Sequence, residues 1–379
     1  MPDSASLRIL HCFRSPVGGI FRHVRDLAEH HHRAGHKVGI ICDSTTGGSH
    51  EDALFASINP YLDLGLKRTP IRRSIGPADV LTLRKCTSEI RKLQPDIIHG
   101  HGAKGGAFAR LIGSQLRVSR SRVARLYSPH GGSLHYRSAP FTGRFYFALE
   151  RWLSAYTDGV AFVSEFERGI YMDKIGSRAA RNRLIYNGLA DEEFEDVVPD
   201  NSATDFMYIG MMRDLKGPDV FVKAFIRTEE IIGRPLTATM VGDGDDKAKY
   251  EEMVLVSGRP ERVAMHSAMP VRHALRLGKT VVMPSRAESM PYLVLEALAA
   301  GRPIIATNVG GIPEIFADNK CGLVPPDDVE ALAQVMARSI NHPEEKHLNA
   351  PNKESLKARF SAGDMASRMM DFYRECRSA

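Results

Sequence analysis

The sequence predicts an α/β protein made of two doubly wound domains, each with a parallel sheet between helices. Apolar runs of strand length alternate with helices of roughly 10–15 residues along the whole chain. The alternation breaks once, in the acidic segment 191–203, and then restarts. A length of 379 residues also exceeds one ordinary core and suits two domains of roughly 150–200 residues. We therefore expect domains at 1–190 and 191–361, with 191–203 as the linker and a ligand cleft between the domains.

The elements of the first half follow from the apolar spacing and the positions of glycine. The first helix has its apolar residues at Ile20, Val24, Leu27 and Ala28, and Gly35 is a natural stop. Strands are expected at 8–13, 37–42, 95–99, 123–128, 159–164 and 183–186, and helices at 20–34, 78–93 and 105–114.

The second half repeats this rhythm and ends in a separate helix. Strands are expected at 205–209, 236–241, 262–265, 280–283 and 303–306, and helices at 218–229, 246–256, 292–300 and 328–340. An apolar stripe of Met365, Met369, Phe372 and Tyr373 predicts a final packed helix over 362–377. We expect this C-terminal segment, about 362–379, to pack back on the first domain.

Charge is unevenly divided between the two halves. Residues 1–190 hold 28 Lys and Arg against 15 Asp and Glu, whereas the rest holds 23 against 30. A basic half suggests an anionic partner, either a membrane surface, a lipid-phosphate acceptor or nucleic acid, unless the charge is only solubilising. The run Arg110, Arg117, Arg120, Arg122 and Arg125, with the aromatic and basic segment 135–147, could dock on anionic lipid or form an ordinary basic surface. Nucleic acid is not expected, because no binding motif accompanies the charge.

The rest of the composition points to a cytoplasmic protein. No apolar run reaches the roughly 20 residues that span a bilayer, and the N-terminus lacks a signal-peptide cleavage site. The five cysteines are scattered without ligand-like spacing, which argues for a reducing compartment and against a zinc site. We expect a cytoplasmic location, with possible peripheral contact at the inner face of the cell membrane.

The segment from Pro284 to Glu314 is the densest in chemically useful groups. A strand ends at Pro284, a loop carries Glu288, and Pro291 suits the first turn of a helix that contains Glu296. The start of that helix offers free backbone N–H groups to a pyrophosphate. Gly310 and Gly311 let the backbone approach a ligand closely. The two carboxylates could hold two hydroxyl-bearing parts of one ligand.

This segment resembles the signature of glycosyltransferase family four, the retaining group-one enzymes with the GT-B fold. The resemblance rests on Glu-x7-Glu at Glu288 and Glu296, followed by Ala-x-x-x-Gly-x-Pro and Val-Gly-Gly-x-x-Glu. It implies that Glu288 lies near the donor sugar and that Glu296 binds the ribose hydroxyls. It also implies that the backbone from Met290 through Pro291 to Tyr292 lies near the sugar hydroxyls, and that Leu295 approaches the phosphates.

A second segment, from Tyr208 to Gly217, resembles the cationic segment of the same family. Lys216 matches the lysine that pairs with the diphosphate. Met211 stands where the family usually has arginine, and Arg213 may take that role in its place. Two cations aimed at a leaving diphosphate would stabilise its charge. Helix N-termini and these cations would then replace a metal ion, so no metal-chelating donor site is expected.

Two turns in the first half complete the expected site. Gly18 and Gly19 stand in a loop before a helix, and the resemblance implies that this loop closes over the donor phosphate and the acceptor. His130 resembles the family's His-Gly turn near the donor sugar, and His99 and His101 could line the acceptor side.

The predicted activity is metal-independent transfer of a hexose from a UDP- or GDP-linked sugar to an acceptor hydroxyl, with retention of configuration. No separate cofactor is expected. The acceptor would be a carbohydrate or a lipid-linked molecule in cell-surface polysaccharide or glycolipid biosynthesis. Two alternatives stay open. A nucleotide-dependent oxidoreductase would need the glycine fingerprint, which Gly242-Asp-Gly244 lacks. A catalytically inactive sugar-nucleotide-binding protein is the other.

Overall fold

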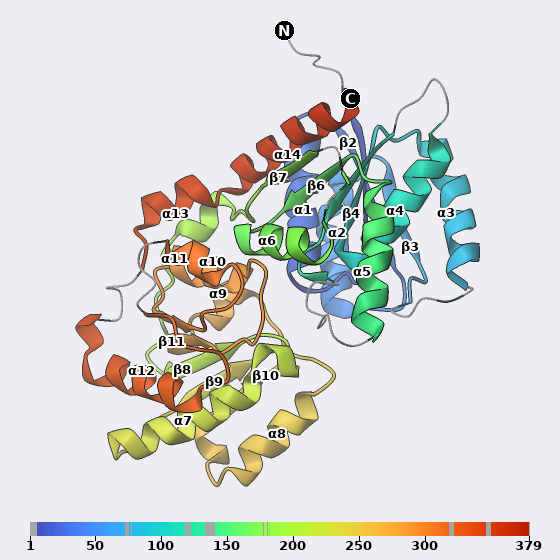
Figure 1. Ribbon diagram of the computed structural model, residues 1–379. Coiled ribbons are helices and arrows are strands. Elements are labelled where there is room, and N and C mark those ends of the chain that lie inside the picture. Colours follow the sequence, from blue (N-terminus) through green and yellow to red (C-terminus); the bar gives the residue numbers. More distant parts are fainter. Residues whose placement is uncertain are drawn as a thin grey trace. The chain divides into compact units, whose positions relative to one another are not determined.

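The computed structural model divides the chain into two compact units, which are described separately. Unit 1 comprises Met1–Gly188 together with Ala362–Ala379, and unit 2 comprises Leu189–Ser361 (Figure 1). The structure describes residues 6–72, 76, 78–117, 123–132, 141–176, 178–179, 181–317, 322–345 and 350–378. No helix of these described ranges is long and apolar enough to cross a bilayer.

Unit 1 is built on a seven-stranded parallel sheet in the order β3-β2-β1-β4-β5-β6-β7. Its five central strands are short, largely apolar and mostly buried on both faces, as parallel strands between helices usually are, whereas the edge strands β3 and β7 are more polar and only partly buried. They are β1 (Arg8–Phe13), β2 (Lys37–Asp43), β3 (Gly65–Thr69), β4 (Ile97–His101), β5 (Ala124–Ser128), β6 (Gly159–Phe162) and β7 (Arg181–Leu184).

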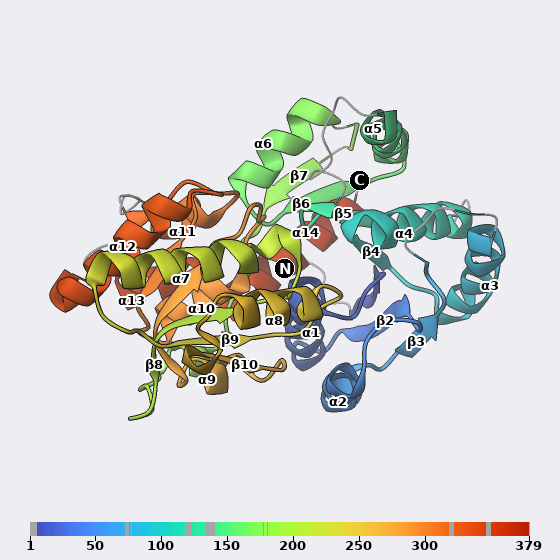
Figure 2. The same ribbon diagram turned by 90° about the horizontal axis from the view of Figure 1, so that it is seen from below.

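Helices cover both faces of this sheet. On one face α1 and the C-terminal helix α14 pack against each other and against β1, β4 and β5, with Leu27 and Met369 in the shared core. On the other face α3 and α4 pack on β1 and β2 through Ile90 and Ile112 (Figure 2). The helices are α1 (Gly18–Arg33), α2 (Ser49–Ile58), α3 (Ala78–Leu93), α4 (Gly102–Leu116), α5 (Phe141–Ser154), α6 (Glu165–Lys174) and α14 (Ala362–Arg377).

Unit 2 repeats the design with a five-stranded parallel sheet in the order β10-β9-β8-β11-β12. One face packs on α7, α8 and α12, and the other on α9 and α10. The strands are β8 (Thr204–Ile209), β9 (Ala238–Val241), β10 (Val263–His266), β11 (Gly278–Met283) and β12 (Ile304–Ala306). The helices are α7 (Pro218–Ile232), α8 (Lys247–Val256), α9 (Val271–Ala274), α10 (Tyr292–Ala299), α11 (Ile312–Phe316), α12 (Val329–Asn341) and α13 (Lys353–Arg359).

The strand order reverses once in each sheet, between β1 and β4 in unit 1 and between β8 and β11 in unit 2. In open α/β sheets, ligands bind beside the carboxyl ends of the strands at such a reversal. In unit 1 those ends lead to the loop before α1 and to His101. In unit 2 they lead to the segments that carry Lys216 and Glu288. The topology therefore predicts two candidate ligand-binding sites, one in each unit.

The segment 191–203 is not the free linker that its composition predicts. Asp191–Phe194 forms a 3₁₀ helix in unit 2, and the Phe194 carbonyl accepts a hydrogen bond from Lys353. The amide of Val197 donates to the carbonyl of Ala300. These hydrogen bonds and the buried ring of Phe194 make the segment part of unit 2.

Candidate functional site

Unit 2 brings Lys216 and Glu288 together, although they lie 72 positions apart in the chain. The Lys216 ammonium donates to Glu288 Oε1 over 2.5 Å, and the Ser285 hydroxyl donates to the same oxygen over 2.8 Å. The side chains of Lys216 and Glu288 are 24% and 8% exposed, so the pair is reachable but largely shielded from water. The sequence assigned these residues to diphosphate and sugar separately, and the structure makes them direct neighbours.

Two glycines hold this pair in place because each allows a backbone contact that a side chain would block. Gly217, with φ of +67°, lies so close to the carbonyl oxygen of Pro284 that an added Cβ would come within 2.2 Å of it. Gly310, with φ of +61°, would place a Cβ 1.8 Å from the carbonyl oxygen of Glu288. Positive φ and these close approaches both require glycine. The loops that carry Lys216 and Glu288 are therefore fixed by backbone packing.

Arg286 fastens the same two loops together, and the sequence analysis gave it no role. Its guanidinium bonds both carboxylate oxygens of Asp219, each over 2.9 Å, and its amide donates to the carbonyl of Leu215. A third nitrogen donates to Asp327 over 2.6 Å. Burial alone would raise the pKa of Asp219, but the hydrogen bonds and charge of Arg286 outweigh it and keep that pKa below its usual value. A bidentate arginine of this kind fixes geometry as well as charge.

The helix α10 follows the Glu288 loop and carries the other predicted donor residues. Pro291 is its N-cap and not its first helical residue, and no side chain caps the helix start. The backbone N–H groups of the first turn have no acceptor within the helix. Met290 and Tyr292 are buried, and Glu296 is 8% exposed in the second turn. Leu295 is fully buried, so any ligand contact from it would come from its backbone.

Arg213 stands apart from the Lys216 pair. It caps the short 3₁₀ helix Asp214–Lys216 through its backbone, and its side chain is exposed. Among the described residues it has no ion-pair partner, in contrast to Lys216. Met211, the residue at the usual arginine position of the family, is 38% exposed, and its carbonyl accepts from the Tyr208 hydroxyl. A free cation thus lies three positions before Lys216.

The turn after β9 contains an Asp-x-Asp spacing, Asp243-Gly244-Asp245. The Asp243 carboxylate accepts from Lys247 over 2.7 Å and from the amide of Ala268 over 2.7 Å. These bonds, led by the one from Lys247, lower the pKa of Asp243 below its usual value. Because its carboxylate is already used within the turn, Asp243 is poorly disposed to chelate a metal ion.

In unit 1 the glycine-rich loop leads directly into α1. The helix begins at Gly18, two residues earlier than predicted, with φ of +71° at Gly18. Gly18 and Gly19 are exposed, and the first turn has neither a capping side chain nor an acidic residue. Such an open N-terminus of a 16-residue helix has the polarity that an anion requires.

His130 follows β5 in a left-handed conformation with φ of +49°. The next amide, that of Gly131, donates to Glu167 Oε1 over 2.5 Å, and the amide of Val163 donates to Oε2 over 3.0 Å. Glu167 lies in the first turn of α6 and is buried. This carboxylate therefore holds the strained turn that presents His130. Strain of this kind is common at functional sites.

His130 belongs to a larger group of histidines at the reversal of strand order. His11 Nδ1 lies 2.9 Å from His101 Nε2, and His101 Nδ1 lies 3.1 Å from His130 Nε2. Burial, followed by the charges of neighbouring histidines, holds the pKa of His11, His101 and His130 well below the usual value. These rings are therefore neutral at pH 7. His23, from α1, packs edge-on against His130 at 4.9 Å between ring centroids.

His99 and His101 are buried in the core of unit 1 and do not line a surface for an acceptor. The two nitrogens of His99 bond the hydroxyl of Tyr373 at 2.7 Å and that of Ser128 at 2.9 Å. The C-terminal helix α14, which carries Tyr373, is thereby tied to the centre of the sheet.

The predicted basic run is mostly internal. Arg110 is fully buried and pairs with Glu150 over 2.9 Å. Arg117 and Arg125 both pair with Asp158. Arg120 and Arg122 lie outside the described residues, as do residues 135–140 of the segment 135–147. The three described arginines thus neutralise carboxylates within unit 1 and leave little charge for an external anion.

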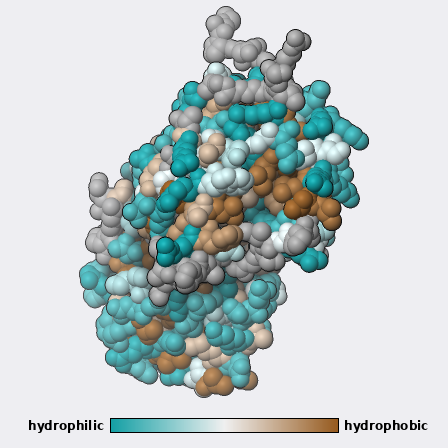
Figure 3. Space-filling model, turned by 45° about the vertical axis from the view of Figure 1, so that its right-hand side comes forward, coloured by the Kyte–Doolittle hydropathy of each residue, from teal (hydrophilic) through white to brown (hydrophobic). Residues whose placement is uncertain are grey.

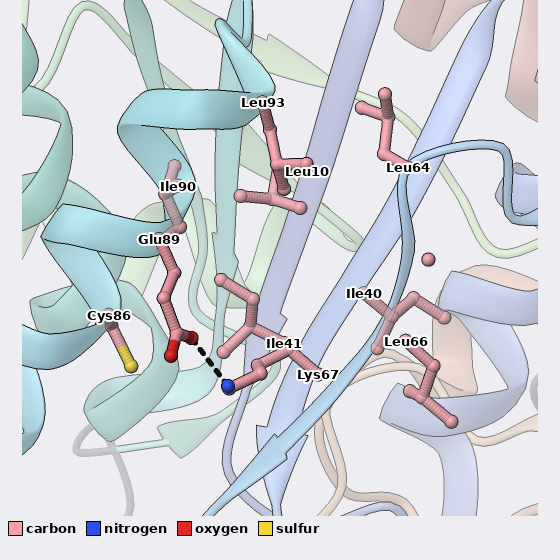
Figure 4. A pocket seen from close by; sticks show the side chains of 11 residues that line it. Leu10, Ile40, Ile41, Leu64, Leu66, Lys67, Cys86, Glu89, Ile90 and Leu93 are labelled. Atoms are coloured by element: carbon pink, nitrogen blue, oxygen red, sulfur yellow. Dashed lines mark ion pairs between the residues drawn. The ribbon is translucent and has the colours of Figure 1, made fainter.

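Unit 1 also contains a cavity of about 210 Å³ between α3 and the strands β1, β2 and β3. Figure 4 shows its aliphatic side chains and the ion pair of Lys67 with Glu89, 2.5 Å long. The lining offers no group suited to a phosphate or a sugar apart from this pair, so we do not count the cavity as part of the candidate site.

Models of known protein families match segments of both units. Residues 17–193 match the model of the family described as Glycosyltransferase Family 4, and residues 203–342 match that of Glycosyl transferases group 1. EpsD of Bacillus subtilis, a protein named as a glycosyltransferase, is 28% identical over 333 residues, covering 83% of this chain and 85% of that protein. The alpha-D-kanosaminyltransferase of Streptomyces kanamyceticus is 25% identical over 303 residues, covering 73% and 77%.

Solved structures agree on the fold. The sucrose-phosphate synthase of Thermosynechococcus elongatus superposes with a TM-score of 0.77 at 22% identity, covering 98% of this chain and 99% of that one. Anabaena HepE, solved in complex with UDP, gives a TM-score of 0.75 at 15% identity, covering 97% and 100%. The predicted GT-B fold, with two Rossmann-like domains, is confirmed. The two family models together match most of the chain, which therefore belongs to the group 1 glycosyltransferases of family 4.

Proposed function

We propose that this glycosyltransferase moves a hexose from a UDP- or GDP-linked donor to an acceptor hydroxyl with retention of configuration. The donor would bind unit 2, and unit 1 would serve the acceptor. The observation that carries the proposal is the group formed by Lys216, Glu288 and Ser285, held by the backbone contacts of Gly217 and Gly310. This group lies where the strand order of unit 2 reverses.

The pair of Lys216 and Glu288 suits a donor whose charge changes during the reaction. When a sugar leaves, negative charge grows on the diphosphate, and a preorganised cation stabilises that charge without first having to move. Glu288 keeps the ammonium in place before the donor arrives, and its own carboxylate can accept from sugar hydroxyls. Arg213, exposed and without an ion-pair partner among the described residues, adds a second cation that can turn toward the diphosphate.

Glu296 and the start of α10 complete the donor half of the proposal. A largely buried carboxylate is a strong acceptor for the vicinal hydroxyls of a ribose. The N–H groups at the helix start, near Met290, Pro291 and Tyr292, suit phosphate or sugar oxygens. Anabaena HepE, which shares the fold, was solved with UDP.

We assign no metal ion to the donor diphosphate and no separate cofactor to the reaction. Lys216, Arg213 and the helix N-termini supply positive charge, and the Asp243 carboxylate is engaged within its own turn. The departing phosphate would help to deprotonate the acceptor on the same face of the sugar. Gly18, Gly19 and His130 remain our candidates for ligand contact in unit 1.

We further propose an acceptor that belongs to cell-surface polysaccharide or glycolipid assembly, with contact between unit 1 and an anionic membrane. The helix α5 supports that contact. Phe145 and Trp152, seven positions apart on one helix face, are 59% and 49% exposed, and the exposed Arg144 and Arg151 stand beside them. Figure 3 shows apolar patches among polar side chains on one face of the molecule. Aromatic and basic side chains together favour a lipid interface.

The test measures donor binding and transfer separately. Thermal shift with UDP-, GDP- and ADP-sugars should show stabilisation by one of the first two, and labelled donor with membrane extract should yield a glycosylated product. NMR of that product reports the anomeric configuration, and inversion would overturn the retaining assignment. Stabilisation without transfer to any extract would favour the inactive sugar-nucleotide-binding protein. Full activity after exhaustive chelation is expected if the donor needs no metal.

A further inference from the structure

We propose that His23, His101 and His130 form a binding site for a divalent transition-metal ion in unit 1. One ring nitrogen from each histidine lies within 4.8 Å of the other two. The three residues come from α1, from the end of β4 and from the turn after β5, so the fold gathers them from distant parts of the chain. They meet beside the reversal of strand order in unit 1.

His23 supplies the clearest sign of a missing partner. Its Nδ1 lies 3.1 Å from the amide oxygen of Asn187, which can only accept, so the ring proton is on Nδ1. Nε2 then carries a lone pair. This nitrogen is fully buried and has no hydrogen-bond partner among the described residues. A buried acceptor without a partner is costly, and a cation would satisfy it.

His101 and His130 direct nitrogens toward each other in the same place. His101 Nδ1 and His130 Nε2 are 3.1 Å apart, and a single proton is shared between them when no metal is bound. The other nitrogen of His101 bonds His11 Nδ1, so His101 can keep its proton on Nε2 and present a lone pair from Nδ1. A metal ion would replace the shared proton, as metal binding to imidazoles commonly does.

The surroundings resemble the outer shell of known histidine sites. Metal-bound histidines usually donate their second ring N–H to a carbonyl or another acceptor, which fixes the ring. Asn187 does this for His23, and His11 can do it for His101. His130 is only half-buried, which leaves one coordination position on its side for water or a ligand.

The other cluster of unit 1, formed by His11, His99 and His101, is less suitable. The rings of His99 and His101 lie close together, 3.9 Å apart between centroids, with their planes tilted by 38°. Both nitrogens of His99 are also taken by hydroxyl groups. The geometry therefore favours the site that contains His23.

The donor set indicates which metals can bind. Three neutral imidazoles suit Zn²⁺, Co²⁺, Ni²⁺ and Cu²⁺, whereas Mg²⁺ and Ca²⁺ prefer oxygen ligands. The scattered cysteines led the sequence analysis to exclude zinc, but this site uses no thiolate. Its three ligands belong to unit 1, whereas Lys216 and Arg213, which we assign to the donor diphosphate in place of a metal, belong to unit 2. The inference concerns binding by unit 1 and does not depend on the proposed transfer reaction.

The experiment uses the full chain without an affinity tag, stripped of metal by a chelator and then titrated. Zn²⁺ is followed by calorimetry, and Co²⁺ by its visible absorption, which reports coordination number. We expect one equivalent of each metal to bind, and Mg²⁺ not to bind. His23→Gln and His101→Gln should each weaken binding by at least about 100-fold. Circular dichroism and thermal melting check that both variants fold.

Two controls separate this site from accidental binding. His273→Gln changes an exposed histidine of unit 2 and should leave metal affinity unchanged. His342→Gln removes the exposed group of His342, Glu344 and Glu345, which is a further possible source of affinity among the described residues. The proposal is overturned if the wild-type chain binds no Zn²⁺. It is equally overturned if folded His23→Gln binds as tightly as wild type, or if only His342→Gln abolishes binding.

Discussion

The two units place very different chemistry at equivalent points of similar sheets. In unit 2 the reversal of strand order carries a lysine, two carboxylates and an arginine clamp, joined by short charged hydrogen bonds. In unit 1 the same point carries neutral imidazoles, and two of them, His11 and His23, have a buried nitrogen without a hydrogen-bond partner among the described residues. The side chains at the unit 2 site are charged, whereas the imidazoles at the unit 1 site are neutral.

The fold thus determines where a site forms, whereas the residues at that site determine its protonation state. A carboxylate paired with a cation gains stability from being charged, so its pKa falls. A histidine buried without a carboxylate gains stability from being neutral, so its pKa also falls, but from a much higher starting value. The two units should consequently respond to acid in different pH ranges.

The largest expected effect is therefore selective acid unfolding of unit 1. Burial, opposed by the hydrogen bond to Ala366, lowers the pKa of His31 from its usual 6.5 to about 3. Stability from a lowered histidine pKa is complete above pH 6.5 and is lost as the pH falls toward 3. At pH 5 the stability lost relative to pH 7 amounts to about 2 kcal/mol for His31 alone. His11, His23, His99, His101 and His130 shift in the same direction.

Unit 2 should keep its stability over the same interval. Hydrogen bonds and charge from Arg286 and Lys247 lower the pKa of Asp219 and Asp243, whose usual value is 3.8, so their contribution is lost only below that pH. Trp152 is the single tryptophan and lies in unit 1, so its fluorescence reports that unit. Urea titrations followed by Trp152 fluorescence should show a lower unfolding midpoint for unit 1 at pH 5 than at pH 7. Hydrogen exchange of unit 2 amides over the same titrations should show a smaller fall in the midpoint of unit 2. His31→Gln should reduce the fall of the unit 1 midpoint between pH 7 and pH 5, whereas His273→Gln should leave that fall unchanged.

The sequence predicted the fold well because both halves have strong apolar periodicity. Predicted and observed bounds agree at β1, α3 and α14, and elsewhere mostly within two or three residues. The sequence analysis missed α2, α5, α6, α9, α11, α13 and β3. The first of these follows a polar loop, and β3 has a Lys and an Arg in its five residues. Tertiary packing stabilises these elements, for example α2 against α1, β3 against β2, and α5 and α6 against β5 and β6, and local composition does not reveal such packing.

The two candidate sites differ in how far the sequence could predict them. Most of the unit 2 site lies in one short stretch, from Pro284 to Glu314, so its spacing was visible. Its partner Lys216 was found from a second motif, but Arg286 was overlooked because one arginine in a loop carries no pattern. The histidine site needs His23, which the sequence analysis gave no role, together with His101 and His130, which it assigned to two different strand ends. That the three are neighbours becomes visible only when the strands are placed side by side.

The second prediction concerns the lysine cation at the unit 2 site, which the unit 1 site lacks. Lys216→Ala should lower kcat by about 10²–10³-fold, because the leaving diphosphate loses a preorganised cation. Folding should change little, since the side chain of Lys216 is partly exposed. Steady-state transfer assays and thermal melting measure both. Lys249→Ala, an exposed lysine of the same unit, is the matched control. Wild-type kcat in Lys216→Ala would remove Lys216 from the reaction.

The backbone contacts around Glu288 offer a third and smaller test. Gly310→Ala should destabilise unit 2 by about 1–3 kcal/mol through the clash with the Glu288 carbonyl, beyond the cost of positive φ. Gly258→Ala is the control, because Gly258 has φ of +72° and open space around its Cβ. That control should cost only about 1 kcal/mol. Urea unfolding compares the two, and donor titration should show weaker binding for Gly310→Ala alone. Equal effects of both variants on stability and binding would mean that the contact is unimportant.

The smallest expected effect concerns the outer surface of unit 1. Replacing Phe145 and Trp152 with serine should reduce binding to phosphatidylglycerol vesicles by about 10-fold, since each exposed ring contributes roughly 1 kcal/mol or less at an interface. Replacing Leu255 and Val256, which are 65% and 74% exposed in unit 2, with serine removes comparable apolar surface and should have no effect. Vesicle sedimentation measures both double variants. If the unit 2 variant loses as much binding as the α5 variant, exposed apolar area alone explains the affinity. If neither loses any, α5 does not contact the membrane.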